Sequence, residues 1–164
     1  MTFPKNLKII DLMMGIPSNA DRNDWYEFMK PLLLDKESNE LFSFPAEYMF
    51  KDVPVTGDQK DFVAYVINEM DKYGISKSFI GLNEKQEEFQ RAYKNHSDRF
   101  FFNYPANPNN GMEEVRTIKR LHKEYGIKGV DAFPSGLCPQ ALINDKKWYP
   151  IYATCVELDI PFSC

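Results

Sequence analysis

The chain has 164 residues, of which 27% are charged and 43% are apolar, a composition typical of a globular domain and unlike that of a disordered or membrane-spanning chain. Its 20 Lys and Arg against 24 Asp and Glu give a formal net charge of -4, which argues against nucleic acid as a partner. The first apolar stretch, 7–16, is too short for a bilayer, which needs about 20 apolar residues, so no membrane partner is expected. Three cysteines without a Cys-x-x-Cys pair indicate reduced thiols and a cytoplasmic protein.

Short apolar runs bounded by glycine, proline or charged residues predict five β-strands. These strands cover residues 7–14, 75–82, 99–104, 127–133 and 160–164. Amphipathic or polar segments between them predict helices over 84–95, over 111–125 and from Pro150 to about residue 158. Because no hairpin turn joins two neighbouring apolar runs, the strands are expected to be parallel, in successive βα units.

A further helix is predicted before the second strand. Thr56 and Gln59 have the spacing of a capping box, with Thr56 as the N-cap. Apolar residues then follow at helical spacing, and Gly74 is placed to end the helix. They are Phe62, Val66, Met70 and Tyr73.

Residues 18–57 form an aromatic insertion after the first strand, with short helices expected around 22–34. In a parallel α/β fold this insertion lies over the carboxyl ends of the strands. Its aromatic side chains, Trp25 among them, are candidates to bind a flat substrate beneath a lid. They are equally suited to anchoring the insertion or to making a dimer contact.

Two architectures are compatible with this order of strands and helices. Five βα units in this length suit an open five-stranded doubly wound parallel sheet, whereas a complete (β/α)8 barrel of the TIM type needs about 250 residues. The last apolar strand favours the barrel, because an open sheet would leave Ile160, Phe162 and Cys164 at an exposed edge. We therefore expect one domain, residues 1–164, holding about the first five βα units of a barrel truncated at its carboxyl end. Such an edge also favours self-association, so a homo-oligomer is possible.

Several segments resemble, in order and spacing, the amidohydrolase-related family. This family includes metal-dependent hydrolases and the aminocarboxymuconate-semialdehyde decarboxylase type of lyase. The resemblance spans nearly the whole chain and implies an eight-stranded barrel with a metal at its carboxyl-end mouth. The segments are Ile10-Asp11, 96–100, 124–130, Phe133-Pro134, 149–152 and 157–161.

The family's first metal motif is Asp-x-His-x-His at the end of strand one. Asp11 matches its first position, but Met13 and Gly15 occupy the two histidine positions. A thioether is a soft ligand and glycine supplies no side chain, so neither suits the zinc or manganese that the family implies. A divalent metal is expected only in a longer protein, and no metal site can be assigned within these residues.

Two carboxylates are the candidate catalytic residues. Asp11, near the carboxyl end of the first strand, suits a general base, or instead accepts N–H groups of the following loop. Asp131 projects toward the mouth with Phe133, a candidate substrate-binding residue, if Val130 and Ala132 face the helices. Apolar neighbours often raise the pKa of such a carboxylate, but it could equally cap a helix or pin a loop.

The resemblance implies a hydrolase that acts on a small organic substrate through metal-activated water. Two alternatives remain open. One is a decarboxylase-type lyase of the same family, and the other is a non-catalytic barrel that binds a ligand or partner. The missing motif histidines at Met13 and Gly15 are the main support for the non-catalytic alternative.

Overall fold

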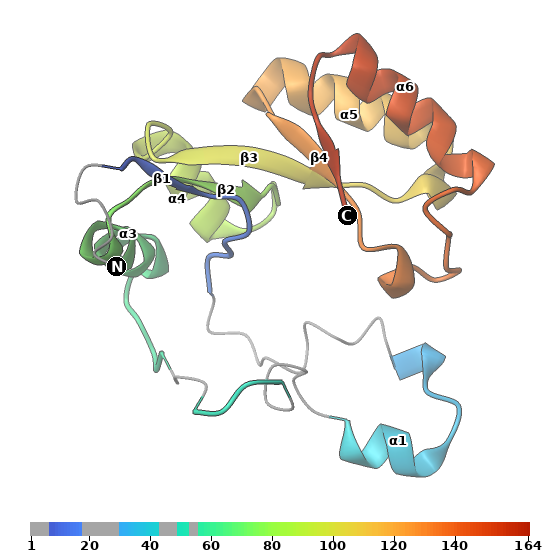
Figure 1. Cartoon of the computed structure of the whole chain (residues 1–164), viewed down its shortest axis with the longest axis horizontal. Helices are drawn as coiled ribbons and strands as arrows, with labels where there is room; N and C mark the ends of the chain where they lie inside the picture. Colours follow the sequence, from blue (N-terminus) through green and yellow to red (C-terminus); the bar gives the residue numbers. More distant parts are fainter. Residues whose placement is uncertain (1–6, 18–29, 43–48, 53–55) are drawn as a thin grey trace.

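The computed structural model describes residues 7–17, 30–42, 49–52 and 56–164. Its body is an open, curled sheet of five strands in the order β1-β2-β3-β4-β5 (Figure 1). Every neighbouring pair of strands is parallel, as predicted from the absence of hairpin turns. The strands are β1 Ile9–Asp11, β2 Ile75–Gly81, β3 Phe100–Pro105, β4 Gly129–Asp131 and β5 Phe162–Ser163.

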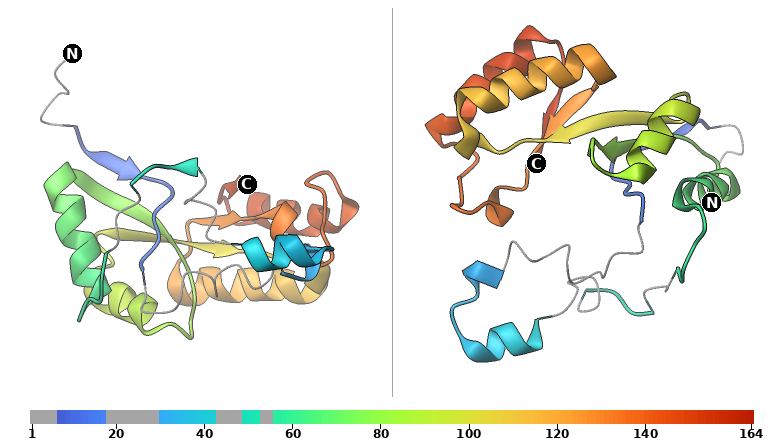
Figure 2. Two further views of the ribbon diagram at one scale, coloured as in Figure 1. Left: turned by 90° about the horizontal axis from the view of Figure 1, so that it is seen from below. Right: turned by 180° about the vertical axis from the view of Figure 1, so that it is seen from behind.

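Helices connect successive strands and form a continuous layer. The helices of the body are α3 Phe62–Tyr73, α4 Glu87–Asn95, α5 Met112–Tyr125 and α6 Tyr149–Glu157. Figure 2 shows α3 and α4 beside the β1–β2 end of the sheet and α5 and α6 beside its other end. The Tyr93 hydroxyl donates to the Glu124 carbonyl across α4 and α5, and the Lys119 and Glu157 side chains pair at 2.7 Å across α5 and α6.

Alternate residues of each strand point to opposite faces of the sheet. Ile80, Phe102 and Val130 lie in the core against the helices. The other face carries Phe79 and Asn103 and is not covered by the helices of the body. The core therefore occupies one side of the sheet and leaves the other side accessible. From the helices, the core includes Val63, Met70, Phe89, Ala92, Ile118, Leu121, Ile151 and Cys155.

The start of α3 differs from the prediction. Asp61, and not Thr56, is the N-cap, because its carboxylate accepts the N–H groups of Val63 and Ala64. These hydrogen bonds, with Arg91 at 3.1 Å, hold the pKa of Asp61 below its usual value. The Gln59 amide instead donates to the Thr56 carbonyl at 2.8 Å. This hydrogen bond stabilises the loop before α3.

The far end of α3 is as predicted, with one exception. Gly74 ends the helix in the left-handed conformation at φ 71°, which favours glycine. Phe62, Val66 and Met70 are buried, as their spacing predicts, but Tyr73 is exposed. Tyr73 is in the last turn, beyond the point at which α3 packs on the sheet.

The described part of the insertion contains a 3-10 turn at 30–32 and the short helix α1, Lys36–Leu41. Asp35 caps α1 by accepting the Ser38 N–H, which lowers the pKa of Asp35. None of the residues of α1 is buried. Most of the helical region predicted over 22–34, including Trp25, lies outside the described residues.

The fold is thus an α/β fold built on an open five-stranded parallel sheet, as in the open-sheet alternative, although the strands do not have the reversed order of a doubly wound sheet. Its strands follow chain order, and the packed helices of the described body lie against one face. Among the described residues, no helix has the length and apolar character needed to cross a bilayer.

Candidate functional site

A cavity of about 660 Å³ lies on the accessible face of the sheet, toward the carboxyl ends of the strands. Phe79 and Gly129 form part of its inner wall, and the loop after β1 forms part of its rim. In parallel α/β folds this end of the sheet is the usual place for ligands, because loops from several strands meet there. The cavity is therefore the main candidate site. Its polar lining includes Asn103, Asp131 and Ser163.

Asp131, the last residue of β4, is the central polar group of this cavity. The Asn103 side-chain amide donates a hydrogen bond to Asp131 Oδ1 at 2.8 Å. Partial burial raises the pKa of the Asp131 carboxyl group above its ordinary value, as its apolar neighbours predicted. Val130 lies in the core on the helix side, so Asp131, the next residue of the strand, faces the cavity.

Sequence reasoning missed Asn103, which orients the carboxylate. In the sheet register Asn103 lies beside Gly129, and Pro105 lies beside Asp131. The two polar side chains are therefore diagonal neighbours on one face, within hydrogen-bonding reach. The only sequence signal is a single amide in the otherwise aromatic strand 100–104.

Gly129 gives the inner wall its shape. A Cβ atom at this position would lie 2.9 Å from Cε1 of Phe79, so glycine leaves room for that ring. Phe79 also contacts Phe101 edge to face, with the ring centroids 6.0 Å apart. The Phe79 ring makes the wall beside the carboxylate apolar, and Phe101 supports this ring from behind the cavity lining.

Asp11 and Phe133 do not line this cavity. Asp11 Oδ1 accepts the Met13 N–H at 2.8 Å, which is the loop contact considered as its structural role. Phe133 is 56% exposed and follows the end of β4, where the backbone leaves the strand conformation and alternation of faces stops. Trp25, the other candidate for binding a substrate, lies outside the described residues.

The residues at the two motif positions lie at the cavity, but they do not form a metal site. Met13, 95% exposed, and Gly15 both line the rim. No group of three His, Cys, Asp or Glu side chains placed to hold an ion occurs among the described residues. The cavity lining supplies one carboxylate and one thiol, Asp131 and Cys164, beside an amide and a thioether, which is fewer than the roughly three or four imidazole, carboxylate or thiolate ligands that hold zinc. These residues alone do not suit the metal that the family implies.

The histidines lie away from the cavity. His96 ends α4 and precedes β3, at the opposite end of that strand from the cavity. His122 lies in the last turn of α5. Neither can act on a ligand held near Asp131.

No protein-family model and no curated protein sequence matches the chain.

Proposed function

We propose that the chain is part of an amidohydrolase-like (β/α)8 barrel whose carboxyl-end cavity hydrolyses a small, neutral organic substrate. Strands in chain order with helices against one face are the pattern of consecutive units of a barrel, whereas a doubly wound sheet reverses its strand order. The accessible face would then correspond to the barrel interior. The sequence segments that resemble the family support the same assignment.

The observation that carries the proposed activity is the hydrogen-bonded pair of Asp131 and Asn103. A carboxylate whose pKa is raised by burial exchanges protons more readily near neutral pH than an exposed one. Ionised Asp131 would take a proton from water as the water attacks the substrate carbonyl. Protonated Asp131 would then return it to the leaving nitrogen or oxygen, while Asn103 holds the carboxylate in place. No step in this scheme passes through a metal.

The cavity lining supports a neutral substrate. Asp131 is the only side chain of a charged type in the described lining, and the remaining surface is mostly apolar. A carboxylate substrate, which a decarboxylase requires, would meet the negative charge of Asp131 without a compensating cation. This favours the hydrolase over the lyase alternative.

The test is a comparison of two carboxylates in the full chain. Wild type, Asp131→Asn and the exposed control Asp98→Asn would be assayed on a panel of neutral amides, esters and lactones. We expect Asp131→Asn to lose at least about 100-fold in rate, the usual size of acid–base catalysis, and Asp98→Asn to match wild type. Equal turnover by wild type and Asp131→Asn would overturn the proposed role.

A non-catalytic binding barrel is the second candidate, because Met13 and Gly15 replace both histidines of the family motif. If the barrel only binds ligands, panel compounds should bind in the cavity of wild type but be recovered unchanged. They should also bind wild type more tightly, or dissociate from it more slowly, than they do in Asp131→Asn. Calorimetric binding measured beside the turnover assay separates the two functions.

A further inference from the structure

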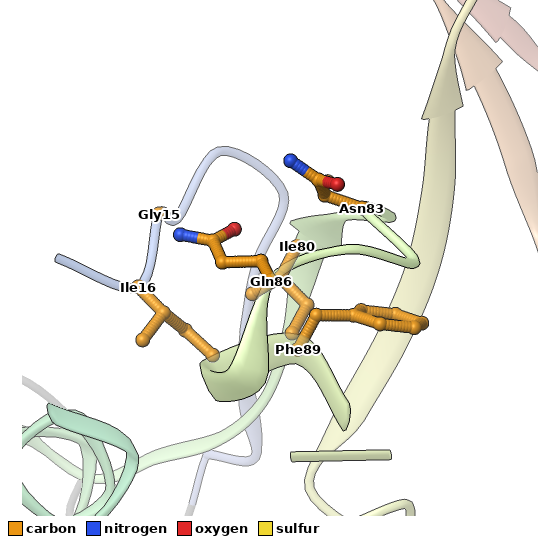
Figure 3. A pocket seen from close by; sticks show the side chains of 7 residues that line it. Gly15, Ile16, Ile80, Asn83, Gln86 and Phe89 are labelled. Atoms are coloured by element: carbon orange, nitrogen blue, oxygen red, sulfur yellow. The ribbon is translucent and has the colours of Figure 1, made fainter. Parts of the chain in front are cut away.

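The two ends of the helix layer differ in how well their apolar side chains are covered. Near the start of α4, a small pocket is lined by Ile80 and Phe89, but both side chains are buried in the core (Figure 3). At the other end of the layer, α6 leaves 60% of Tyr149 and 82% of Val156 exposed. The surface of α6 is therefore apolar and open to a partner.

One face of α6 contains these exposed residues. Its members have the i, i+3, i+4 and i+7 spacing of a single helix face. They are Tyr149, Tyr152, Ala153 and Val156, and we call them the outer face of α6. Ile151 and Cys155 lie in the core instead. Glu157 pairs with Lys119 of α5 at 2.7 Å, so the outer face is directed away from α5 as well as from the sheet.

The loop that precedes α6 extends the outer face. Tyr152 is half-buried at the edge of this face, and its hydroxyl donates to the Ile143 carbonyl. This contact holds the exposed residues Leu142 and Ile143 beside the helix. None of the residues in the extended surface is charged, so covering it removes apolar surface from water without burying an ion.

Opposite charges lie at the two ends of the outer face. Lys146 precedes α6 in a 3-10 turn, which has three residues per turn. Trp148 of this turn lies in the core, and Lys147 contacts Asn109 at 3.0 Å. Lys146 therefore lies on the third side of the turn. Asp159 follows the other end of α6, and like Lys146 it is exposed and makes no ion pair within the described part of the chain.

The outer face is complementary to a second copy of itself. A two-fold axis that passes between Tyr152 and Ala153 places each of these residues beside the partner's copy of the other. The large tyrosine ring then meets a small methyl group, which leaves room for it. Tyr149 and Val156 are equally far from this axis in sequence, so they pair between the two copies in the same way.

The charges select the same arrangement. Lys146 and Asp159 are also equally far from the axis in sequence, so each lysine meets the partner's aspartate. A parallel packing of the two faces would instead place lysine beside lysine and aspartate beside aspartate. The spacing of the apolar residues and the position of the charges are separate features, and both fit one antiparallel register.

We propose that two copies of the chain form a dimer through the outer faces of α6, packed antiparallel about a two-fold axis. One short helix and one loop from each copy form a small interface, so the dimer should be weak and should depend on concentration. The interface lies on the helix side of the sheet, away from the main cavity. It does not depend on the hydrolysis proposed for that cavity.

The first test measures the oligomeric state of the full chain by sedimentation velocity over a wide range of concentration. We expect a reversible equilibrium between monomer and dimer. Val156→Asp should raise the dissociation constant at least about tenfold, because the new carboxylate would be buried against a ring of the partner. The matched control is Met112→Asp, the same kind of change at an exposed apolar residue of α5, which should leave the dissociation constant within about twofold.

A charge exchange tests the antiparallel register. Lys146→Glu and Asp159→Lys should each weaken the dimer about fivefold, because each dimer contains this pair twice. The double exchange should restore most of the lost affinity. Asp159 has φ 53°, so urea unfolding of Asp159→Lys checks that the monomer keeps its stability. Asp131→Asn should dimerise like wild type, which keeps this result separate from a failure of the proposed hydrolysis.

Three outcomes would overturn the proposal. The first is a chain that stays monomeric at every concentration. The second is a dimer that Val156→Asp does not weaken, which would place the contact on another surface, such as the free edge of β5. The third is a double exchange that binds no better than the single exchanges, which would exclude the antiparallel pairing of Lys146 with Asp159.

Discussion

Two neighbouring residues of β3 show how differently the two faces of the sheet are built. Phe102 is buried on the helix side, where its ring meets those of Phe89 and Tyr93 edge to face, at 5.2 and 5.6 Å. Asn103, the next residue, faces the cavity and contacts Asp131. One face of the sheet thus supplies packing, and the other supplies polar chemistry.

The polar groups of the two sides also differ in how well they are satisfied. On the helix side, Glu114 is only 2% exposed, yet its carboxylate accepts hydrogen bonds from the Asn107 N–H and the Asn110 amide. On the cavity side, Asn103 Oδ1 is buried and makes no hydrogen bond in the described part of the chain. An incompletely satisfied polar group beside a desolvated carboxylate is typical of a functional site, where stability is not maximised.

The largest effect on the free energy of unfolding should come from a residue on the helix-covered face of the sheet. Phe102→Ala should cost about 3–5 kcal/mol in the free energy of unfolding, because it leaves a cavity in the core. Phe101→Ala, on the adjacent and only half-buried position, should cost about 1 kcal/mol. Urea unfolding of both variants measures the difference. Similar costs would mean that the two faces are packed alike.

Loss of the buried Glu114 carboxylate should have the next largest effect on the free energy of unfolding. Glu114→Ala should cost about 2–3 kcal/mol, because the partly buried Asn107 N–H would lose its acceptor and the core would lose the buried Glu114 side chain. Glu114→Gln keeps one acceptor oxygen and should cost about 1 kcal/mol. Urea unfolding would again be the measurement, and equal losses in the two variants would argue against a hydrogen-bonding role.

The cavity side should respond to pH. Burial raises the native pKa of Asp131, so the native state holds this proton more tightly than the unfolded chain does. The contribution of Asp131 to stability is therefore fully present below the unfolded pKa, about 3.9, and falls as pH rises through the native pKa. Asp131→Asn should consequently gain stability relative to wild type as pH rises from the unfolded pKa, about 3.9, through the higher native pKa of Asp131.

The control for this pH dependence is Asp98→Asn, at an exposed position. The Asp98→Asn curve is the baseline against which the change in Asp131→Asn is compared. Urea midpoints measured at several pH values give both curves. A flat difference for Asp131→Asn would mean that Asp131 is as well solvated in the native state as in the unfolded chain.

The smallest effect on stability concerns the shape of the cavity. Gly129→Ala would push the outer end of the Phe79 ring aside, at a cost of about 1 kcal/mol, and would narrow the cavity. The matched control is Ser97→Ala, at an exposed position that does not line the cavity. We expect only Gly129→Ala to weaken binding of cavity ligands in calorimetry. Equal binding by the two variants would mean that the position of the Phe79 ring does not affect ligand binding.

Much of the fold could be predicted from local patterns. Apolar runs and the missing hairpin turns predicted five parallel strands. Gly74 ends α3 in the left-handed conformation, as expected, and Gly126 ends α5 in the same conformation. Capping was harder to predict. Thr56 and Asp61 both have side chains that can cap a helix, and the choice depends on where α3 meets the sheet.

The candidate site was predicted only in part, because its parts are distant in sequence. The apolar neighbours of Asp131 indicated its orientation and its raised pKa, since strand alternation and burial are local properties. Its partner Asn103 is 28 residues away and is brought near by the register of β3 and β4. The register depends on how whole strands and helices pack, so sequence spacing does not reveal it.

The sequence by itself determined the class of the fold, the parallel strands and the residues that face the helices, because these follow from composition and from periodicity along the chain. Only the tertiary structure decided that Asn103 orients Asp131 and that Asp11 contacts its own loop. Each of these depends on contacts between separate elements, which form when the apolar faces of the helices close on one side of the sheet.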